Sequence, residues 1–213
     1  MTSQSLYPNH IRHIRKEDLR LLSYAEFGQL LEILTDKVFA ACQERRLRID
    51  AVAPILRSGA FPGCHLASKL GVTGVFPLQY KHTCDADQPL LSRYRGPTLT
   101  SGIPDNGVIL VADTNTVTGE IAQRAAADIR AELPESRIFF ASVMLDVSLE
   151  AIPGVDVMVS ARRTNERRTV PREAARRAGI WNEVFIFPWE NFNEQWSEIR
   201  AAQDGRRAHS SHA

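Results

Sequence analysis

The chain is predicted to fold as an α/β domain in which a mostly parallel sheet is flanked by helices. Short runs of apolar, β-forming residues alternate with segments whose apolar residues recur at helical spacing. Several of these runs are continuous rather than alternating, which is typical of parallel strands buried on both faces. Polar or glycine-containing turns follow two of the runs directly, at the strand ends where α/β sheets bind their ligands.

The composition excludes several classes of protein. The chain has 213 residues, enough for one full core, and its 26 basic and 25 acidic residues leave a net charge of +1, so no global field favours nucleic acid or a membrane. The cysteines lack metal-ligand pair spacing and are interpreted as reduced thiols; they are Cys42, Cys64 and Cys84. No apolar stretch has transmembrane length, and no signal-peptide pattern is present. We therefore expect a cytoplasmic protein.

The first two segments are an arm and a helix, of which we interpret the helix as scaffold. Residues 1–22 mix basic and histidine side chains with a few apolar ones, which predicts an arm packed on the domain or on a second subunit; the alternative is a phosphate-contacting arm. Ser23 and Glu26 form a capping box that opens a helix. Its core face is predicted from helical spacing as Phe27, Leu30, Leu31, Leu34, Val38 and Ala41.

A candidate anion loop follows the first predicted strand, residues 49–57. Ser58 and Gly59 come next, before a helix over about 62–70. A glycine at a strand end indicates either a turn with positive φ or close approach of the backbone to a ligand. Because Arg57 stands beside this bare backbone, the loop suits a diphosphate; the alternative is an ordinary turn with a surface arginine.

A second strand is predicted over 72–82, and residues 83–106 then show no sustained periodicity. A structureless stretch of this length inside a compact domain is usually a functional lid or disordered. Lys81, Arg93 and Arg95 could meet an anion from it. The alternative is a β-hairpin with exposed basic side chains.

Residues 107–120 are the most informative stretch. Four apolar residues, 108–111, predict a buried strand, and Asp113 follows at its carboxyl end. After a loop rich in threonine, a helix opens at Glu120 with one apolar face, formed by Ile121, Ala125, Ile129 and Leu133. A helix start offers free N–H groups and a partial positive charge, so this stretch predicts an anion site beside a carboxylate that could accept sugar hydroxyls.

The remainder contains two more strands, over 137–145 and 155–159, the first ending at Asp146. Residues 161–177 hold seven arginines against two glutamates, and we predict a solvated helix near 171–178. The alternatives are a basic face near a phosphate and, as a weaker rival, RNA binding. A last strand, 184–187, stops at Pro188, and Trp189 either fills core or closes a site. Residues 200–213 are polar and predicted to fray.

Three of these stretches together resemble type I phosphoribosyltransferases, over about residues 22–190. Residues 107–120 resemble their signature for 5-phosphoribosyl diphosphate (PRPP), with an acid, four residues and then Thr118-Gly119. Residues 54–59 resemble the pyrophosphate loop, and 187–190, Phe-Pro-Trp-Glu, resemble the hallmark of the xanthine–guanine and related purine branch. This sequence departs from the pattern at Thr114, where a second acid is usual, and at Ile121, where threonine or serine is usual.

The resemblance implies a type I phosphoribosyltransferase-like fold with a small hood at its C-terminal end. It divides the chain into an arm (1–22), a core (23–160), a hood (161–195) and a polar tail (196–213). It implies transfer of a nucleobase to PRPP with release of pyrophosphate, Mg²⁺ as cofactor, and a homodimer or larger assembly. The residues implied for PRPP binding are Arg57, Ser58, Gly59, Asp113, Thr114, Asn115, Thr116, Val117, Thr118 and Gly119, with Asp113 also catalytic and metal-binding. Those implied for the flexible loop are Lys81, Arg93 and Arg95, and those for the base are Asp146, Trp181, Phe187 and Trp189.

Two questions stay open at this stage. Asp146 stands about where 6-oxopurine members have a lysine, and because a carboxylate accepts hydrogen bonds, it predicts a base other than an ordinary 6-oxopurine. With one acid missing, the group that deprotonates the base is not evident. The departures at Thr114 and Ile121 also favour a rival, a regulator that senses PRPP or a nucleotide without turnover.

Overall fold

A six-stranded sheet forms the centre of the molecule in a computed structural model, which describes residues 14–85, 88–98 and 102–203. The strand order is β4-β3-β2-β5-β6-β7, and every neighbouring pair is parallel except β3 and β4. The strands are β2 (Ala51–Leu56), β3 (Leu78–Asp85), β4 (Gln88–Arg95), β5 (Val108–Thr116), β6 (Arg137–Asp146) and β7 (Val157–Thr164).

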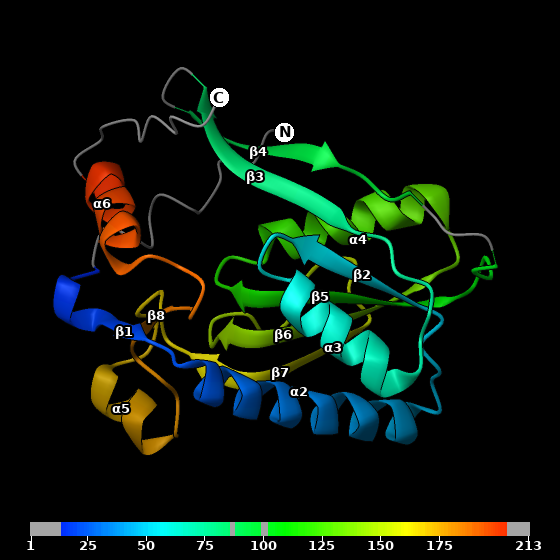
Figure 1. Ribbon diagram of the computed structural model, residues 1–213, viewed down its shortest axis with the longest axis horizontal. Helices are drawn as coiled ribbons and strands as arrows, with labels where there is room; N and C mark the ends of the chain where they lie inside the picture. The colour runs from blue at the N-terminus through cyan, green and yellow to red at the C-terminus, as the bar shows by residue number, and fades with distance from the viewer. Residues whose placement is uncertain (1–13, 86–87, 99–101, 204–213) are drawn as a thin grey trace.

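Helices cover both faces of this sheet. Helices α2 (Tyr24–Arg45) and α3 (Ala60–Leu70) lie on one face, and α4 (Glu120–Glu132) lies on the other (Figure 1). Each face has its own buried cluster of apolar side chains. The predicted α/β architecture is therefore confirmed.

The apolar sequence of β5 does not alternate with polar residues because helices cover both faces of the sheet. Leu110 packs into the cluster beneath α2 and α3, whereas Ile109 and Val111 pack into the cluster beneath α4. Both faces are covered, so both sets of side chains are apolar. The strand continues through Thr116, and β7 continues to Thr164, so each is longer than predicted and β7 extends past the predicted boundary at 160.

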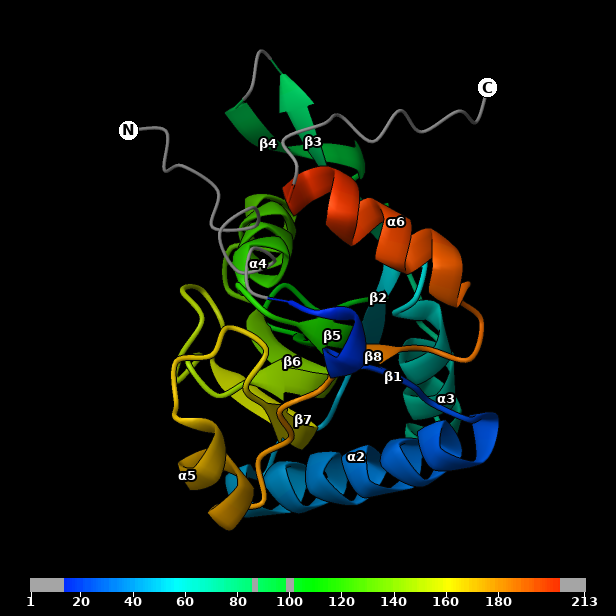
Figure 2. The same cartoon turned by 90° about the vertical axis from the view of Figure 1, so that its left-hand side faces the viewer.

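The hood brings the two ends of the described chain together. Strand β1 (Leu19–Leu21), preceded by the short helix η1 (Lys16–Asp18), pairs in parallel with β8 (Val184–Ile186). Helices α5 (Arg172–Arg177) and α6 (Phe192–Gln203) lie on either side of this pair (Figure 2). The end of the predicted arm is thus part of the hood; residues 1–13 lie outside the described residues.

Residues 83–106 are not the structureless loop that the missing periodicity predicted. Strands β3 and β4 form an antiparallel hairpin there, which satisfies backbone groups that a loop would leave to water. The hairpin is fixed on α4, because the Tyr80 hydroxyl donates to Asp128 Oδ2 at 3.0 Å. The predicted strand over 72–82 begins only at Leu78, after an isolated bridge between Val75 and Val52.

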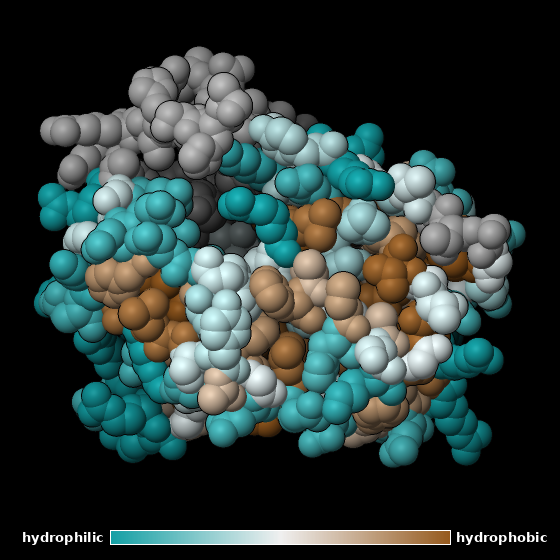
Figure 3. Space-filling view, viewed as in Figure 1, coloured by the Kyte–Doolittle hydropathy of each residue, from teal (hydrophilic) through white to brown (hydrophobic). Residues whose placement is uncertain are grey.

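The predicted polar tail is also partly ordered, because α6 extends to Gln203. Ile199 packs against the small apolar cluster of Ile14 and Val184, and the Gln203 amide donates to the Ile14 carbonyl at 2.8 Å. Among the described residues, no helix has the length and apolar character needed to cross a membrane. Figure 3 shows apolar surface along α3 and at the β1 end of the hood, separated by hydrophilic areas.

Candidate active site

The two loops predicted to bind PRPP lie at one edge of the sheet. Strands β2, β5, β6 and β7 all end on the side where β1, β8 and α6 lie (Figure 1). Because β2 and β5 are neighbouring parallel strands, the loops that follow them lie next to each other. The candidate pyrophosphate loop and the candidate PRPP stretch therefore share one edge, beneath the hood.

The pyrophosphate loop is held tightly against both strands. It begins with a cis peptide bond between Leu56 and Arg57. Gly59 is the N-cap of α3 with φ −64°, so it is not there for a positive φ. A Cβ at this position would lie 2.4 Å from the Ile55 carbonyl oxygen and 2.6 Å from that of Ala112. Close packing on the strand ends is the reason for the glycine.

Arg57 itself is exposed, and its positive charge acts on the carboxyl group of Glu190 in the hood. Burial raises the pKa of the Glu190 carboxyl, and the positive charge of Arg57 partly opposes that shift. Arg57 is therefore close enough to the hood to act on it electrostatically, while its exposure leaves it accessible to an anion.

Asp113 lies buried at the carboxyl end of β5, with 8% of its surface exposed. Burial raises its pKa to about 7, and hydrogen bonds from the Thr114 backbone (2.8 Å) and the Thr116 hydroxyl (3.3 Å) act in the opposite direction. A carboxyl group that is half protonated near neutral pH can accept hydrogen bonds from sugar hydroxyls. A cation beside it would favour its ionised form.

The phosphate loop is shorter than predicted. Thr114 and Thr116 are buried within β5, and the Thr116 hydroxyl lies 3.0 Å from Ser142 Oγ, so neither side chain is presented as an anion ligand. The turn between β5 and α4 is 117–119, in which Val117 and Thr118 are half-buried. It ends at the buried Gly119, the N-cap of α4 with φ 76°. Glu120 begins the helix there and its Oε2 accepts from the Thr118 hydroxyl at 3.3 Å.

Glu166 is a residue of the site that the sequence analysis missed. It follows β7, is 5% exposed, and accepts a hydrogen bond of 3.1 Å from the Asn115 amide. Burial first, and then the carboxylates of Asp146 and Glu190, raise its pKa to about 7, whereas Asn115 and Arg168 lower it. An acidic residue just after a strand end could have identified Glu166 in the sequence. It was missed because that strand was predicted to stop at residue 159, whereas β7 continues to Thr164.

Asp146 does not present a free acceptor to a base. Its Oδ1 accepts from the Ser148 backbone (2.9 Å) and hydroxyl (2.6 Å), and its Oδ2 accepts from the Arg167 backbone (2.9 Å). The fully buried carboxylate thus joins the turn after β6 to the loop after β7. Asp146 therefore has a structural role, and its position no longer indicates a base other than a 6-oxopurine.

The ring and the backbone of Trp181 are likewise engaged by contacts within the protein. The guanidinium groups of Arg20 and Arg162 each lie over its ring, 5.4 Å from the ring centre. Its backbone pairs with the end of β7, donating to Arg163 and accepting from Asn165. The predicted base contact is replaced by a cation–π arrangement that fastens the hood to β1 and β7.

Trp189 and Phe187 connect the hood to the helices. The Trp189 ring stacks on Phe61 of α3 (centroids 3.9 Å apart) and on Phe187 (5.2 Å), while Phe27 of α2 meets it edge-on. Phe187 is buried. These aromatic faces are used within the protein, so the alternative that Trp189 fills core describes the structure, and neither ring is presented as a stacking platform for a base.

The basic residues assigned to a flexible loop lie on the strands of the hairpin. Arg93 forms an ion pair with Asp128 of α4 at 3.3 Å, and Arg124 shares that carboxylate at 3.0 Å. Arg93 therefore lies on a strand and is paired with α4, whereas the prediction placed it on a flexible loop. Lys81 and Arg95 are exposed on β3 and β4.

The arginine-rich segment 161–177 is largely used to build the hood. Arg163 donates to the carbonyls of Val147 and Leu149, and Arg168 and Arg172 form ion pairs with the buried carboxylate of Asp18. Guanidinium groups engaged in this way do not form the open basic face that RNA binding requires.

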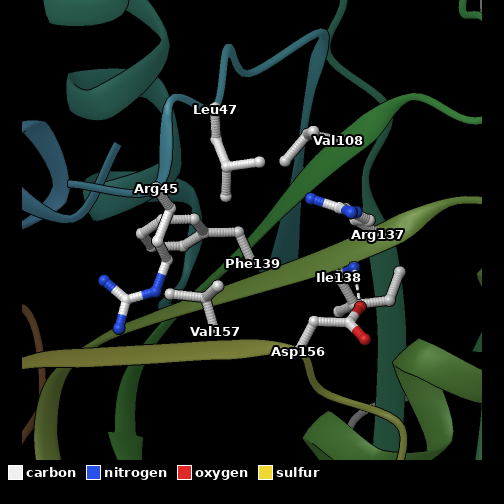
Figure 4. Close-up of a pocket in the computed structure, with 8 residues that line it drawn as sticks. All are labelled: Arg45, Leu47, Val108, Arg137, Ile138, Phe139, Asp156 and Val157. Atoms are coloured by element: carbon white, nitrogen blue, oxygen red, sulfur yellow. Dashed lines mark hydrogen bonds between the residues drawn. The ribbon is translucent and has the colours of Figure 1, made fainter. Parts of the chain in front are cut away.

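A separate cavity of about 460 Å³ lies at the opposite edge of the sheet, where β5, β6 and β7 begin. Figure 4 shows Phe139 between Arg45 on one side and Arg137 on the other, with Val157 below. Parallel α/β sheets bind ligands at their carboxyl edge, so this cavity is not part of the candidate active site.

A parallel sheet with an acid–threonine–glycine loop at its carboxyl edge, a tight arginine loop beside it and a hood above is the fold of type I phosphoribosyltransferases. No protein-family model matches the chain, and no curated protein matches its sequence. Solved structures do match. One is a purine phosphoribosyltransferase from Pyrococcus horikoshii Ot3, at 16% identity and TM-score 0.55, over 82% of this chain and 95% of that chain.

Two further solved structures are similar over most of the chain. The xanthine-guanine-hypoxanthine phosphoribosyltransferase of Helicobacter pylori has 16% identity and TM-score 0.57, over 84% of this chain and 99% of that chain. A hypothetical protein from Neisseria gonorrhoeae with bound ppGpp has 14% identity and TM-score 0.57, over 88% of this chain and 97% of that chain. These comparisons confirm the predicted fold.

Proposed function

We propose that this protein is a phosphoribosyltransferase that joins a purine-like nucleobase to PRPP, releasing pyrophosphate and forming a nucleoside 5′-monophosphate. The proposal rests mainly on one observation. The Arg57 loop and the Asp113 stretch lie at neighbouring strand ends, and the Gly59 backbone packs against the carbonyl of Ala112, the residue before Asp113. The likeness in fold to two purine phosphoribosyltransferases supports it.

Each part of the site has a role in this chemistry. The exposed Arg57 guanidinium, with the backbone of Ser58 and Gly59, would bind the diphosphate that leaves. Asp113 would hold the ribose hydroxyls, and residues 117–119 with the start of α4 would bind the 5′-phosphate. Because the transition state is oxocarbenium-like, positioning and charge stabilisation matter more than a strong nucleophile.

The residues present fit a magnesium ion that is bound mainly through substrate. Among the described residues, no cluster of three or more histidine, cysteine or acidic side chains could hold a metal on its own. Mg²⁺ usually takes one or two carboxylates together with substrate phosphates, and Asp113 supplies such a carboxylate. When bound, the ion would neutralise charge on the departing pyrophosphate.

Pyrophosphate release from PRPP and Mg²⁺, measured against a panel of nucleobases, tests this function. We expect release with at least one purine-like base, and Asp113→Asn should lower kcat/KM about 100-fold or more because the group on the ribose loses its charge. Asp36→Asn, at an exposed position of α2, is the matched control and should retain activity. Release that is equal in wild type and Asp113→Asn would contradict the assignment.

A regulator that binds nucleotide without turnover is the second candidate. Glu120 places a carboxyl group at the helix start that would receive the 5′-phosphate, and Thr114 is buried. The similar protein from Neisseria gonorrhoeae was crystallised with ppGpp. Calorimetric binding of PRPP or ppGpp by a preparation that releases no pyrophosphate with any base would favour this function.

We further propose that the protein is cytoplasmic and assembles as a homodimer or larger oligomer, as the resemblance to the family implies. Sedimentation velocity at micromolar concentration should give at least twice the 23.8 kDa mass of the chain. A single species at the monomer mass would contradict this prediction.

A further inference from the structure

The candidate site lacks an obvious acceptor for the proton that a nucleobase nitrogen loses. Positions 114–119 of the PRPP stretch carry no ionisable side chain. Two acids flank these positions. Glu120 accepts from the Thr118 hydroxyl, and Asp113 accepts with Oδ1 from the Thr114 backbone and with Oδ2 from the Thr116 hydroxyl. A proton acceptor must therefore come from another element.

We infer that Glu166 is the general base that takes the proton from the nucleobase nitrogen as that nitrogen bonds to C1 of PRPP. The inference rests on the proposed transferase function. Glu166 follows β7 at the carboxyl edge of the sheet, and its Oε2 accepts from the Asn115 amide, within the PRPP stretch, at 3.1 Å. It also interacts electrostatically with Glu190 of the hood. A base lying between the PRPP stretch and the hood would meet this carboxylate.

Asn115 provides an independent indication that a ligand belongs here. Its Nδ2 is used by Glu166, but its Oδ1 is buried and has no hydrogen-bond partner among the described residues. An unpaired buried acceptor costs free energy unless a donor arrives. An N–H group of a nucleobase is such a donor, and it would place the base beside Glu166.

The surroundings of Glu166 suit a group that takes and returns a proton near neutral pH. Burial and the carboxylates of Asp146 (β6) and Glu190 (hood) raise its pKa to about 7, while the Asn115 amide and the Arg168 guanidinium oppose them. A general base is most effective when its pKa lies near the working pH, because the basic form is populated and still basic enough to accept the proton.

The step balances without an oxidant or reductant. The proton on the ring nitrogen passes to a Glu166 oxygen, and the electron pair of that N–H bond forms the bond from nitrogen to C1. The bond from C1 to the pyrophosphate oxygen breaks, and its electron pair leaves on pyrophosphate. Glu166 then releases it to solvent, which restores the carboxylate for the next turnover.

Glu166→Gln tests the role, because glutamine keeps the size and the acceptor for the Asn115 amide but cannot take the proton. We expect kcat to fall about 100-fold or more, with the dissociation constant for PRPP within about twofold of wild type. The acid limb of the kcat–pH profile should become less steep, because the titration of Asp113 remains and that of Glu166 is lost. Glu166→Asp, which retains a carboxylate, should recover part of the rate. Glu173→Gln, at an exposed position of α5, is the matched control and should behave as wild type.

The outcomes separate this inference from the proposed function. If the wild-type protein releases no pyrophosphate with any base, the transferase function fails before any variant is made. If wild type turns over and Glu166→Gln does so equally well, the inference is overturned while the function stands. If Glu166→Gln weakens PRPP binding as much as it lowers kcat, or the pH profile is unchanged, Glu166 only positions Asn115 and the inference is overturned as well.

Discussion

Gly59→Ala is expected to lower the free energy of unfolding by about 3 kcal/mol, because overpacking against rigid atoms is among the costlier single substitutions. The new Cβ would lie 2.4 Å from the Ile55 carbonyl oxygen and 2.6 Å from that of Ala112. Both neighbours are backbone atoms of central strands and cannot rotate away. For a domain of this length the melting temperature should fall by roughly 6–12 °C in a calorimetric scan.

Gly28→Ala is the matched control for this substitution. Gly28 lies within α2, and a Cβ built there has no heavy atom within 4 Å. Alanine has the higher helix propensity, so this variant should be unchanged or more stable by up to about 1 kcal/mol. Equal stability of Gly59→Ala and wild type would show that the start of α3 does not pack on the ends of β2 and β5 as described.

The same substitution tests how the site is assembled. The carbonyl of Ala112 that Gly59 approaches belongs to the residue before Asp113. Moving α3 away from β5 would therefore separate the candidate pyrophosphate loop from Asp113, the carboxyl group proposed to hold the ribose. In the fraction of Gly59→Ala that remains folded, PRPP should bind more weakly, since the two halves of the ligand are held by groups that no longer fit together.

The elements that sequence analysis predicted well are those with local signals. The Ser23–Glu26 capping box forms as expected and opens α2. Helix α4 begins at Glu120, and β6 ends at Asp146. Capping, helical spacing and continuous apolar runs depend on residues close in sequence, so they can be recognised without knowledge of the fold. The position of Arg57 and Asp113 at one edge followed from the parallel topology.

What could not be predicted depends on partners distant in the chain. Strand β1 is only three residues long, and it exists because Leu19–Leu21 pairs with Val184–Ile186 at the other end. Trp189 was predicted to contact the base, but its ring stacks on Phe61 of α3. Glu166 lies in an arginine-rich segment of the sequence, where nothing marks it as a site residue. The hydrogen bond that it accepts from the Asn115 amide places it beside the candidate site. Side-chain direction at strand ends is set by such contacts.

Glu166→Gln is expected to stabilise the protein at alkaline pH. Burial raises the pKa of this carboxyl from 4.5 to about 7, so the folded state binds its proton more tightly than the unfolded chain does. That contribution to stability is fully present below pH 4.5 and is lost as the pH rises to about 7. Above pH 7 the buried carboxylate costs about 3 kcal/mol relative to a neutral group, whereas glutamine is neutral at every pH.

Urea unfolding at pH 5 and pH 8 would measure this difference. At pH 8 Glu166→Gln should be more stable than wild type by about 3 kcal/mol, and at pH 5 the gap should shrink toward zero. Asp113 titrates in the same range in both proteins, so its contribution cancels in the comparison. Glu173→Gln, on the exposed face of α5, should show no such pH-dependent gain.

A variant that is more stable and yet turns over more slowly would identify the carboxylate as a functional group. Residues in active sites are often retained at the expense of stability, because the environment that tunes their pKa also disfavours their charge. If Glu166→Gln were instead less stable than wild type at pH 8, attraction by Arg168 and the Asn115 hydrogen bond would outweigh burial. Glu166 would then stabilise the loop after β7 as a charged residue, which is the arrangement expected of a structural role.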